Sequence, residues 1–266
     1  MSGATVSAFV IHLQRAEKRR PQVERLRAAL PMPTQIVDGV DGRILPDAEA
    51  AKVYRPRLAA PTYPFPLLCT EIACFLSHRK AWQAIVDSGL DSGLVLEDDV
   101  APEQPLFDDV CRFVLRHIQP GDYVRLPYRT HTDGGTAVAT EGTMTLVDPR
   151  LPGMGMQAQI IGRGAAQALL RATETFDRPV DAVLQLDGIP GVRMLAARPV
   201  CIRQIAEQLG GTVVQKKNKS LGEVLDREVR RAWYRLGVWC RSRRPRSAGE
   251  QRGSRRGGGG GGGGGG

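Results

Sequence analysis

Blocks of apolar residues separated by helical patterns predict an α/β protein. Apolar runs of strand length occur at residues 6–13, 35–37 and 94–96. Such uninterrupted runs are typical of strands that are buried on both faces of a parallel sheet. Between the first two runs, apolar residues recur at helical spacing over residues 16–30, and Pro31 and Pro33 stop the helix. The order strand, helix, strand predicts the opening of a β-α-β unit.

A second amphipathic helix is predicted from Thr70 to just before Gly89. Thr70 is a favourable N-cap, Glu71 falls in the first turn, and Gly89 suits the C-terminal end. The apolar stripe follows the 3.6-residue period and consists of Ile72, Phe75, Leu76, Trp82, Ile85 and Val86. His78 lies within this helix. A histidine of a half-buried helix usually has a structural role, so His78 is not placed in the site.

The rest of the chain has weaker signals for helices and strands. Residues 43–69 contain five prolines, which predicts an irregular segment with one short helix near residues 48–53. Loops of this length are often functional lids or substrate contacts. Farther along, helices are expected at 111–118 and 164–173, and strands at 122–126, 143–147 and 192–196.

Three adjacent carboxylates, Glu97, Asp98 and Asp99, follow the strand at residues 94–96. Such a concentration of negative charge at the end of a buried strand needs a positive partner. A hard divalent cation that bridges to a phosphate fits, because Mg²⁺ and Mn²⁺ bind through one or two carboxylates plus substrate phosphates. An exposed acidic turn is the alternative, and the triplet alone does not decide between the two.

Residues near the ends of the first two strands belong to the same region. Ligands of open α/β folds bind beyond the carboxyl ends of the strands, which places Arg15, Arg19 and Asp38 near one pocket. The forked guanidinium of an arginine suits a diphosphate. For each arginine taken alone, a solvated helix face is the more common explanation.

The net positive charge of the chain comes from its C-terminal part. Residues 216–256 hold 14 of the 37 Lys and Arg and 4 of the 28 Asp and Glu, which leaves 23 basic and 24 acidic residues elsewhere. The neutral body offers no basic patch, so a nucleic-acid partner is not expected. We expect three parts: a catalytic domain at 1–215, a basic helix and tail at 216–256, and a disordered poly-glycine end at 257–266.

The basic part favours contact with a membrane surface. Residues 221–239 can form an amphipathic helix with two tryptophans set among arginines, and residues 221–246 as a whole suit an anionic membrane surface. A helix packed on the domain is the alternative. No apolar segment approaches the roughly 20 residues that span a bilayer, and the five cysteines form no CxxC pair. We therefore expect a cytoplasmic protein, peripheral on the inner face of the cell membrane.

Several segments together resemble glycosyltransferase family 25, which includes galactosyltransferases of lipopolysaccharide, lipooligosaccharide and collagen. Residues 70–82 and 94–100 resemble the centre of the family, and residues 9–15 with Arg19 resemble its opening strand. Val37-Asp38-Gly39 and Pro179-Val180-Asp181 match two later elements. This chain departs from the family pattern at His12, at Gln159 where a Tyr is usual, and at Gly162 where a Ser is usual.

The resemblance implies a GT-A-like α/β fold, a single domain whose mixed, mainly parallel sheet is flanked by helices. It also implies a UDP-sugar donor and Mn²⁺, or Mg²⁺, as cofactor. Asp99 and Glu97 are then the expected metal ligands. Asp181 is the expected catalytic base on the acceptor side, with Asp187 as its rival. The expected nucleotide-sugar residues are Arg15, Arg19, Asp38, Glu97 and Asp98.

The expected function is inverting transfer of a sugar, first of all galactose, to a lipopolysaccharide or related glycan acceptor. The acceptor hydroxyl must lose its proton on the side of the anomeric carbon opposite the diphosphate, so the base should come from a segment other than the triplet. The alternative is a non-catalytic relative that binds a glycan or membrane surface. A nucleotidyltransferase is a third possibility, although no Gly-rich phosphate loop occurs near residue 15.

Overall fold

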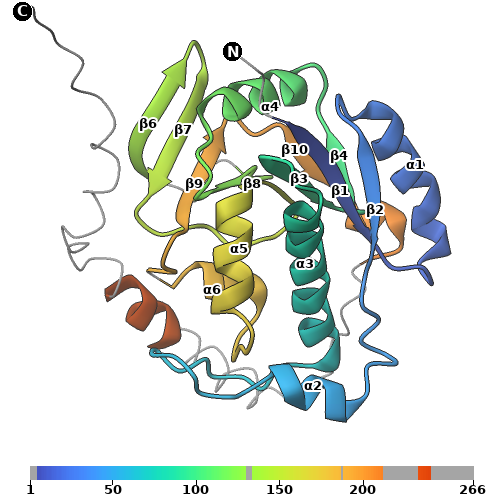
Figure 1. Cartoon of the computed structure of the whole chain (residues 1–266), viewed down its shortest axis with the longest axis vertical. Helices are drawn as coiled ribbons and strands as arrows, with labels where there is room; N and C mark the ends of the chain where they lie inside the picture. The colour runs from blue at the N-terminus through green and yellow to red at the C-terminus, as the bar shows by residue number, and fades with distance from the viewer. Residues whose placement is uncertain (1–4, 130–133, 187, 212–232, 241–266) are drawn as a thin grey trace, which may run out of the picture.

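One mixed sheet of eight strands forms the centre of the computed structural model, which describes residues 5–129, 134–186, 188–211 and 233–240 (Figure 1). The strand order is β2-β1-β3-β8-β5-β9-β7-β6. All strands run in one direction except β8 and β7, which are antiparallel to both of their neighbours. The bounds are β1 Val6–His12, β2 Thr34–Asp38, β3 Ser92–Glu97, β5 Asp122–Arg125, β6 Gly135–Glu141, β7 Met144–Pro149, β8 Ala158–Gly162 and β9 Arg193–Arg198.

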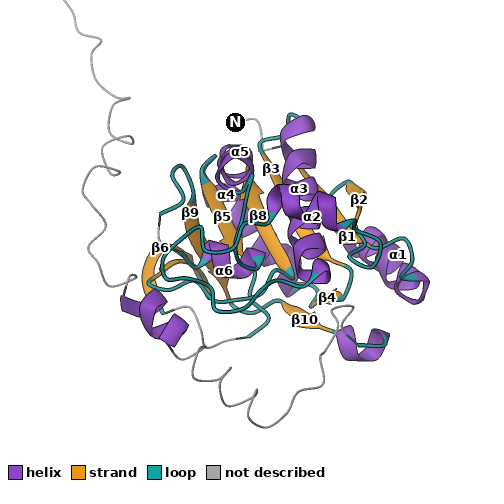
Figure 2. Cartoon of the chain, turned by 90° about the horizontal axis from the view of Figure 1, so that it is seen from below, coloured by secondary structure: helices purple, strands orange, loops and turns teal. Residues whose placement is uncertain are grey.

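Helices cover both faces of this sheet (Figures 1 and 2). One face is covered by α1 (Arg20–Ala29), which follows the 3-10 turn η1 (Glu17–Arg19), and by α4 (Leu106–His117). The other is covered by α3 (Cys69–Asp87), α5 (Arg163–Ala172) and α6 (Val180–Leu184). A small second sheet pairs β4 (Val100–Pro102) with β10 (Ile202–Gln204), and η2 (Ala206–Leu209) and α2 (Asp47–Val53) complete the elements.

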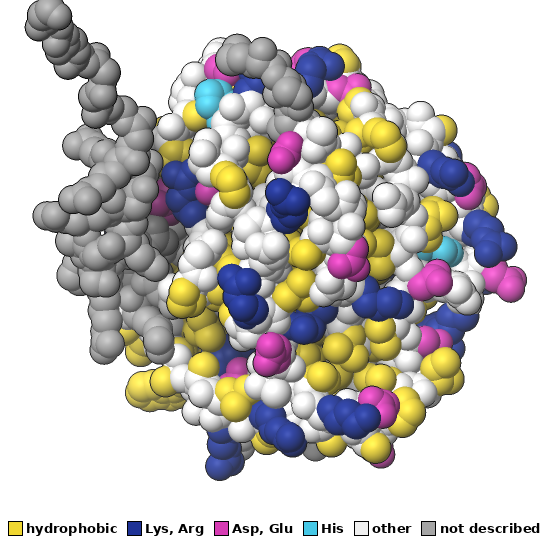
Figure 3. All heavy atoms as spheres, in the orientation of Figure 1, with side chains coloured by type: hydrophobic (Ala, Val, Ile, Leu, Met, Phe, Trp, Pro, Cys, Tyr) yellow, Lys and Arg dark blue, Asp and Glu magenta, His cyan; other side chains and the backbone are white. Residues whose placement is uncertain are grey.

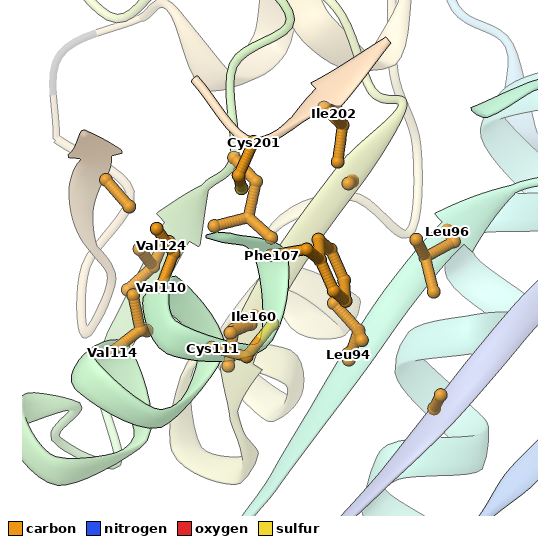
Figure 4. Close-up of a cluster of buried hydrophobic side chains, with 14 of the residues drawn as sticks. Leu94, Leu96, Phe107, Val110, Cys111, Val114, Val124, Ile160, Cys201 and Ile202 are labelled. Carbon is orange, nitrogen blue, oxygen red and sulfur yellow. The ribbon is translucent and has the colours of Figure 1, made fainter. Parts of the chain in front are cut away.

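The alternation of side chains along the central strands produces two cores. Leu94 and Leu96 of β3 pack with Phe107 of α4 in the first core (Figure 4). Val95, between them in sequence, points to the opposite face and packs with Trp82 of α3 in the second. Because successive side chains point to opposite faces, a shift of one residue would exchange the two sets. This alternation also fixes the direction of the side chains that follow β3.

The predicted fold class is confirmed: the protein is α/β, with a large mixed sheet flanked by helices. The predicted N-cap was wrong, because α3 begins at Cys69 and Leu68 is its N-cap residue. Glu71 has the expected role, since its carboxylate accepts a hydrogen bond from the Leu68 N–H at 2.8 Å. No helix among the described residues is both long enough and apolar enough to cross a membrane.

The irregular segment at residues 54–68 is held by one buried arginine. Arg178 is fully buried and forms a bidentate pair with Asp177, at 2.6 and 2.9 Å. Its guanidinium also donates to the carbonyl oxygens of Ala59 at 2.7 Å and Pro61 at 3.1 Å, and to the Tyr234 hydroxyl at 3.3 Å. A single side chain therefore links three segments that are far apart in the sequence.

Replacing Arg178 with alanine is expected to lower the free energy of unfolding by about 3–5 kcal/mol, because it leaves a buried carboxylate without its partner. Urea unfolding measures this loss. Arg112→Ala is the matched control, since Arg112 pairs with Asp109 on the surface and an exposed pair contributes about 1 kcal/mol or less. Equal effects of the two variants would contradict the role given to Arg178.

Candidate functional site

The carboxyl ends of three adjacent parallel strands bring the predicted acidic residues to one edge of the sheet. In the register of the sheet, Ile11 of β1 lies beside Glu97 of β3, and His12 lies beside Asp38 of β2. This is the edge at which open α/β folds bind their ligands. The spatial grouping expected from the sequence is therefore present.

The acidic triplet divides between the two faces of the sheet. Glu97 continues the alternation of β3 toward α3, where its Oε1 lies 3.2 Å from Nε2 of His78. Asp98 lies on the α1 side, with Oδ2 2.7 Å from Nδ1 of His12 and Oδ1 2.5 Å from Nη1 of Arg19. Asp98 is buried, and both of its carboxylate oxygens are engaged by protein groups.

Asp99 has a free acceptor position. Its Oδ2 lies 3.3 Å from Nη1 of Arg19, whereas its buried Oδ1 has no hydrogen-bond partner among the described residues. Burial and the negative charge of Glu97 raise the pKa of Asp99 from 3.8 to about 7, although Arg19 acts in the opposite direction. A buried carboxylate oxygen without a donor marks the point at which a cation would relieve the repulsion.

A second group of potential ligands adjoins Glu97. Cys74 and His78 are four residues apart on α3, so they lie on the same face of the helix, and their ligand atoms and that of Glu97 lie within 4.8 Å of one another. Burial raises the pKa of the Cys74 thiol, and nearby carboxylates raise it further. Hard Mn²⁺ and Mg²⁺ prefer oxygen ligands, such as the carboxylates of Glu97 and Asp99, to a sulfur ligand.

Asp181 reaches this region from a different segment. It lies in the first turn of α6, where its Oδ1 accepts a hydrogen bond from the Ala182 N–H at 2.8 Å. Burial raises the pKa of Asp181, backbone hydrogen bonds from Ala182 and Gly155 oppose the rise, and the charge of Glu97 adds to it. The fold thus places Asp181 within electrostatic reach of the triplet. Asp187 lies outside the described residues.

The two predicted arginines differ in their surroundings. Arg19 is buried, and besides Asp98 and Asp99 it binds the carbonyl oxygen of Gly211 at 2.8 Å. Arg15 has a side chain that is 30% exposed and pairs with Asp41 at 2.5 Å. Arg19 therefore offsets the charge of Asp98 and Asp99 from within the protein, whereas the side chain of Arg15 is accessible to solvent.

Asp38 lies at the outer side of the same edge. It is exposed, and its carboxylate accepts a hydrogen bond from Gln14 at 2.9 Å. Together with His12 it borders a pocket of about 420 Å³ between β1, β2 and α1. The residues that line the pocket are His12, Gln14, Arg20, Val23, Glu24, Ile36 and Asp38.

Two histidines were missed as site residues. His78 is 1% exposed and contacts Glu97, and its Nδ1 has no partner among the described residues. His12, noted only as a departure from the family pattern, binds Asp98. The available signals were the position of His12 at the end of the first strand and the spacing of His78 four residues after Cys74.

The sequence profile of glycosyltransferase family 25 (LPS biosynthesis protein) matches residues 6–184. Procollagen galactosyltransferase 1 of Danio rerio is 36% identical over 95 residues, which are 35% of this chain and 16% of the fish protein. The inactive glycosyltransferase 25 family member 3 of Mus musculus is 35% identical over 95 residues, again 35% of this chain and 16% of the relative. The chain thus spans about a sixth of either relative.

A solved structure has a weaker similarity. The mannose-1-phosphate geranyltransferase from Thermus thermophilus is 12% identical, and the match covers 72% of this chain and 73% of that one, with a TM-score of 0.35. A score this low supports no conclusion about function.

Proposed function

Because the chain belongs to glycosyltransferase family 25, we propose that it is an inverting glycosyltransferase that takes a sugar from a UDP-sugar. Galactose is the first candidate for the sugar, and a lipopolysaccharide or related glycan is the acceptor. The observation that carries the proposal is that Glu97 and Asp99 lie at the carboxyl end of β3, the edge at which open α/β folds bind ligands. Asp181, from another segment, lies within electrostatic reach of Glu97. The relatives named as galactosyltransferases and the family description support the choice of sugar and acceptor.

Glu97 and Asp99 would hold Mn²⁺ or Mg²⁺, which when bound supplies Lewis-acid stabilisation of the departing diphosphate. Arg19 keeps Asp98 and Asp99 in place through its ion pairs of 2.5 and 3.3 Å. Asp98 orients His12 through their contact of 2.7 Å, and His12 and Asp38 line the pocket on the nucleotide side of the site. Arg15, whose side chain is partly exposed, adds positive charge toward the diphosphate.

Asp181 acts as the general base of the proposed reaction. The acceptor hydroxyl attacks the anomeric carbon, the bond between that carbon and the diphosphate oxygen breaks, and the hydroxyl proton passes to the Asp181 carboxylate. The diphosphate leaves with the bonding electrons. Because the hydroxyl attacks from the opposite face of the anomeric carbon, the configuration of that carbon inverts. A base with a raised pKa takes this proton more readily near neutral pH than an ordinary aspartate.

A donor screen tests the proposal. The purified chain is incubated with Mn²⁺ and a series of UDP-, GDP- and CMP-sugars, and the released nucleotide is measured with and without a glycan acceptor. The expected result is UDP release from one or more UDP-sugars, increased by the acceptor. Release of GDP or CMP alone would contradict the assigned donor.

The alternative is a non-catalytic relative that binds a glycan or a membrane surface. It is favoured by Gln159 and Gly162, which depart from the family pattern, and by the existence of a relative named as inactive. Gln159 is completely buried in β8, beside Val95 of β3, and its Oε1 has no partner among the described residues. Calorimetry with UDP and Mn²⁺ separates the two functions, because the binding relative should show no metal-dependent affinity for the nucleotide.

A further inference from the structure

Residues 233–240 form a helix that is docked on the body through one side. The ring of Tyr234 packs edge to face against Tyr63, with 5.3 Å between the ring centroids, and its hydroxyl accepts a hydrogen bond from Arg178. Val238, one turn later, is buried. A Cβ at Gly237 would lie 2.9 Å from the Cβ of Pro61, so the helix backbone approaches this loop closely. These contacts determine which side of the helix faces the body of the protein.

The opposite side of the same helix exposes large apolar residues. At 100° per residue, its exposed residues fall on one continuous face. The exposed fractions are 70% for Trp233, 48% for Leu236 and 41% for Trp239. Arg235 and Cys240 are the other exposed residues of this face. Elsewhere, the exposed large hydrophobic residues of the described chain lie in separate elements and loops: Ile36, Ile44, Leu58, Val138 and Met154.

The charge of the flanking sequence identifies the occupant of this face. Residues 216–256, which surround the helix in sequence, hold 14 basic and 4 acidic residues. On the face of the body seen in Figure 3, residues of both charges are interspersed. Tryptophan is enriched where a membrane meets water, and basic residues near such an apolar face add attraction to anionic lipids.

We propose that the exposed face of helix 233–240 is a docking surface for an anionic lipid bilayer, with Trp233, Leu236 and Trp239 entering the headgroup region. Arg235, exposed on the same face, would bind a lipid phosphate, and the net positive charge of the flanking sequence adds attraction to anionic lipids. Tyr234 and Val238 hold the helix on the body meanwhile, so the body and the bilayer occupy opposite sides of one helix.

The same contacts relate this surface to the acceptor side of the site. Tyr234 binds Arg178, and the Arg178–Asp177 pair precedes Asp181 by a few residues. Burial raises the pKa of Tyr234, and the charges of Asp177 and Asp181 raise it further, so Tyr234 lies within electrostatic reach of the proposed base. The docked side of helix 233–240 therefore contacts the segment that leads to Asp181. A glycolipid acceptor, whose role rests on the proposed function, would approach that segment from the bilayer.

Intrinsic fluorescence tests the surface in the full-length protein. Two of the three tryptophans lie on the exposed face, and Trp82 is completely buried in the core as a constant background. Vesicles of phosphatidylcholine with one quarter phosphatidylglycerol are expected to shift the emission to shorter wavelength, and co-sedimentation should report binding. Pure phosphatidylcholine vesicles should bind at least tenfold more weakly.

Variants separate this surface from a purely electrostatic contact. The double variant Trp233→Ala, Trp239→Ala is expected to weaken vesicle binding at least tenfold. Cooperative urea unfolding of the variant should show that the body remains folded, so that the loss of binding comes from the removed side chains. Val138→Ala, which removes an exposed apolar residue of β6, is the matched control and should bind like the unchanged protein.

Three results would overturn the inference: no binding to anionic vesicles, binding unaffected by the double variant, or tighter binding to duplex DNA than to vesicles at the same salt concentration. The assays contain no sugar nucleotide, so their outcome is independent of transferase activity. Vesicle binding without any nucleotide release would contradict the proposed function and leave the lipid surface standing.

Discussion

Replacing Asp99 with asparagine is expected to reduce the rate of sugar transfer by roughly 10²–10³-fold or more. Asparagine keeps the shape of the side chain and can still accept a hydrogen bond from Arg19, but it removes the negative charge that the cation requires. Stabilisation of a leaving group by a bound metal ion contributes several kcal/mol, which corresponds to this loss in rate. Steady-state kinetics with saturating Mn²⁺ measures the effect.

The same variant is expected to be more stable than the unchanged protein at high pH in metal-free buffer. The raised pKa of Asp99, about 7 against 3.8, means that the folded protein binds this proton more tightly than the unfolded chain. The stabilisation that this proton contributes is complete below 3.8, the pKa of Asp99 in the unfolded chain. It is lost as the pH rises through about 7, the pKa in the folded protein. Asparagine stays neutral at every pH. The free energy of unfolding of the variant should therefore equal that of the unchanged protein at pH 4 and exceed it by roughly 2–4 kcal/mol at pH 8.

Asp109→Asn is the control for both measurements, because the Asp109 side chain is half-exposed on α4 and its ion pair in the described chain is with Arg112. It should change neither the rate nor the pH dependence of stability. An Asp99→Asn protein with full turnover would contradict the metal assignment. A variant that loses activity together with stability would indicate a structural role instead.

Replacing Asp181 with asparagine is expected to lower kcat by roughly 10²–10⁴-fold, the usual contribution of a general base. The affinity for UDP in the presence of Mn²⁺ should stay unchanged, since Asp181 acts on the acceptor. In the unchanged protein, the rate should fall as the pH drops through the pKa of Asp181. Because burial raises that pKa, the fall should begin above the range of an ordinary aspartate.

The rival residue supplies the comparison for this prediction. Asp187→Asn should retain most of the activity, whereas Asp181→Glu should recover part of what Asp181→Asn loses, because it restores a carboxylate at a slightly different distance. Loss of activity only in the Asp187 variant would transfer the role of base to Asp187. A weaker affinity for UDP in the Asp181 variant would place that residue on the donor side.

The spacing of hydrophobic residues predicted β3, which leads into the acidic triplet, and the neighbouring β1 and α3. The apolar runs of β1 and β3 and the stripe of α3 are local signals, and each corresponds to an element of the structure. β8 was not predicted, because Gln159 interrupts its apolar run even though it is completely buried in the sheet. The start of α4 was placed five residues too late, since Asp108 and Asp109 obscure the apolar pattern of its first turn.

The composition of the candidate site was easier to predict than its internal pairing. Parallel strands bring their carboxyl ends together, so the grouping of Asp38 with Glu97 followed from the order of elements. The division of the triplet between two faces did not follow, because it depends on where β3 ends. The partners of Arg19 could not be predicted either: a long side chain reaches Asp98 and Gly211 only through tertiary packing.

Release of UDP from UDP-galactose by the purified 266-residue chain is the most direct test of a metal-nucleotide site at Glu97 and Asp99. The unchanged protein, Glu97→Gln and the control Asp109→Asn are compared with Mn²⁺ and with EDTA, in the presence of a glycan acceptor. The predicted result is release by the unchanged protein and the control with Mn²⁺ alone, and a loss of at least about 100-fold in Glu97→Gln. Equal release by all three proteins, or release that continues in EDTA, would contradict the account.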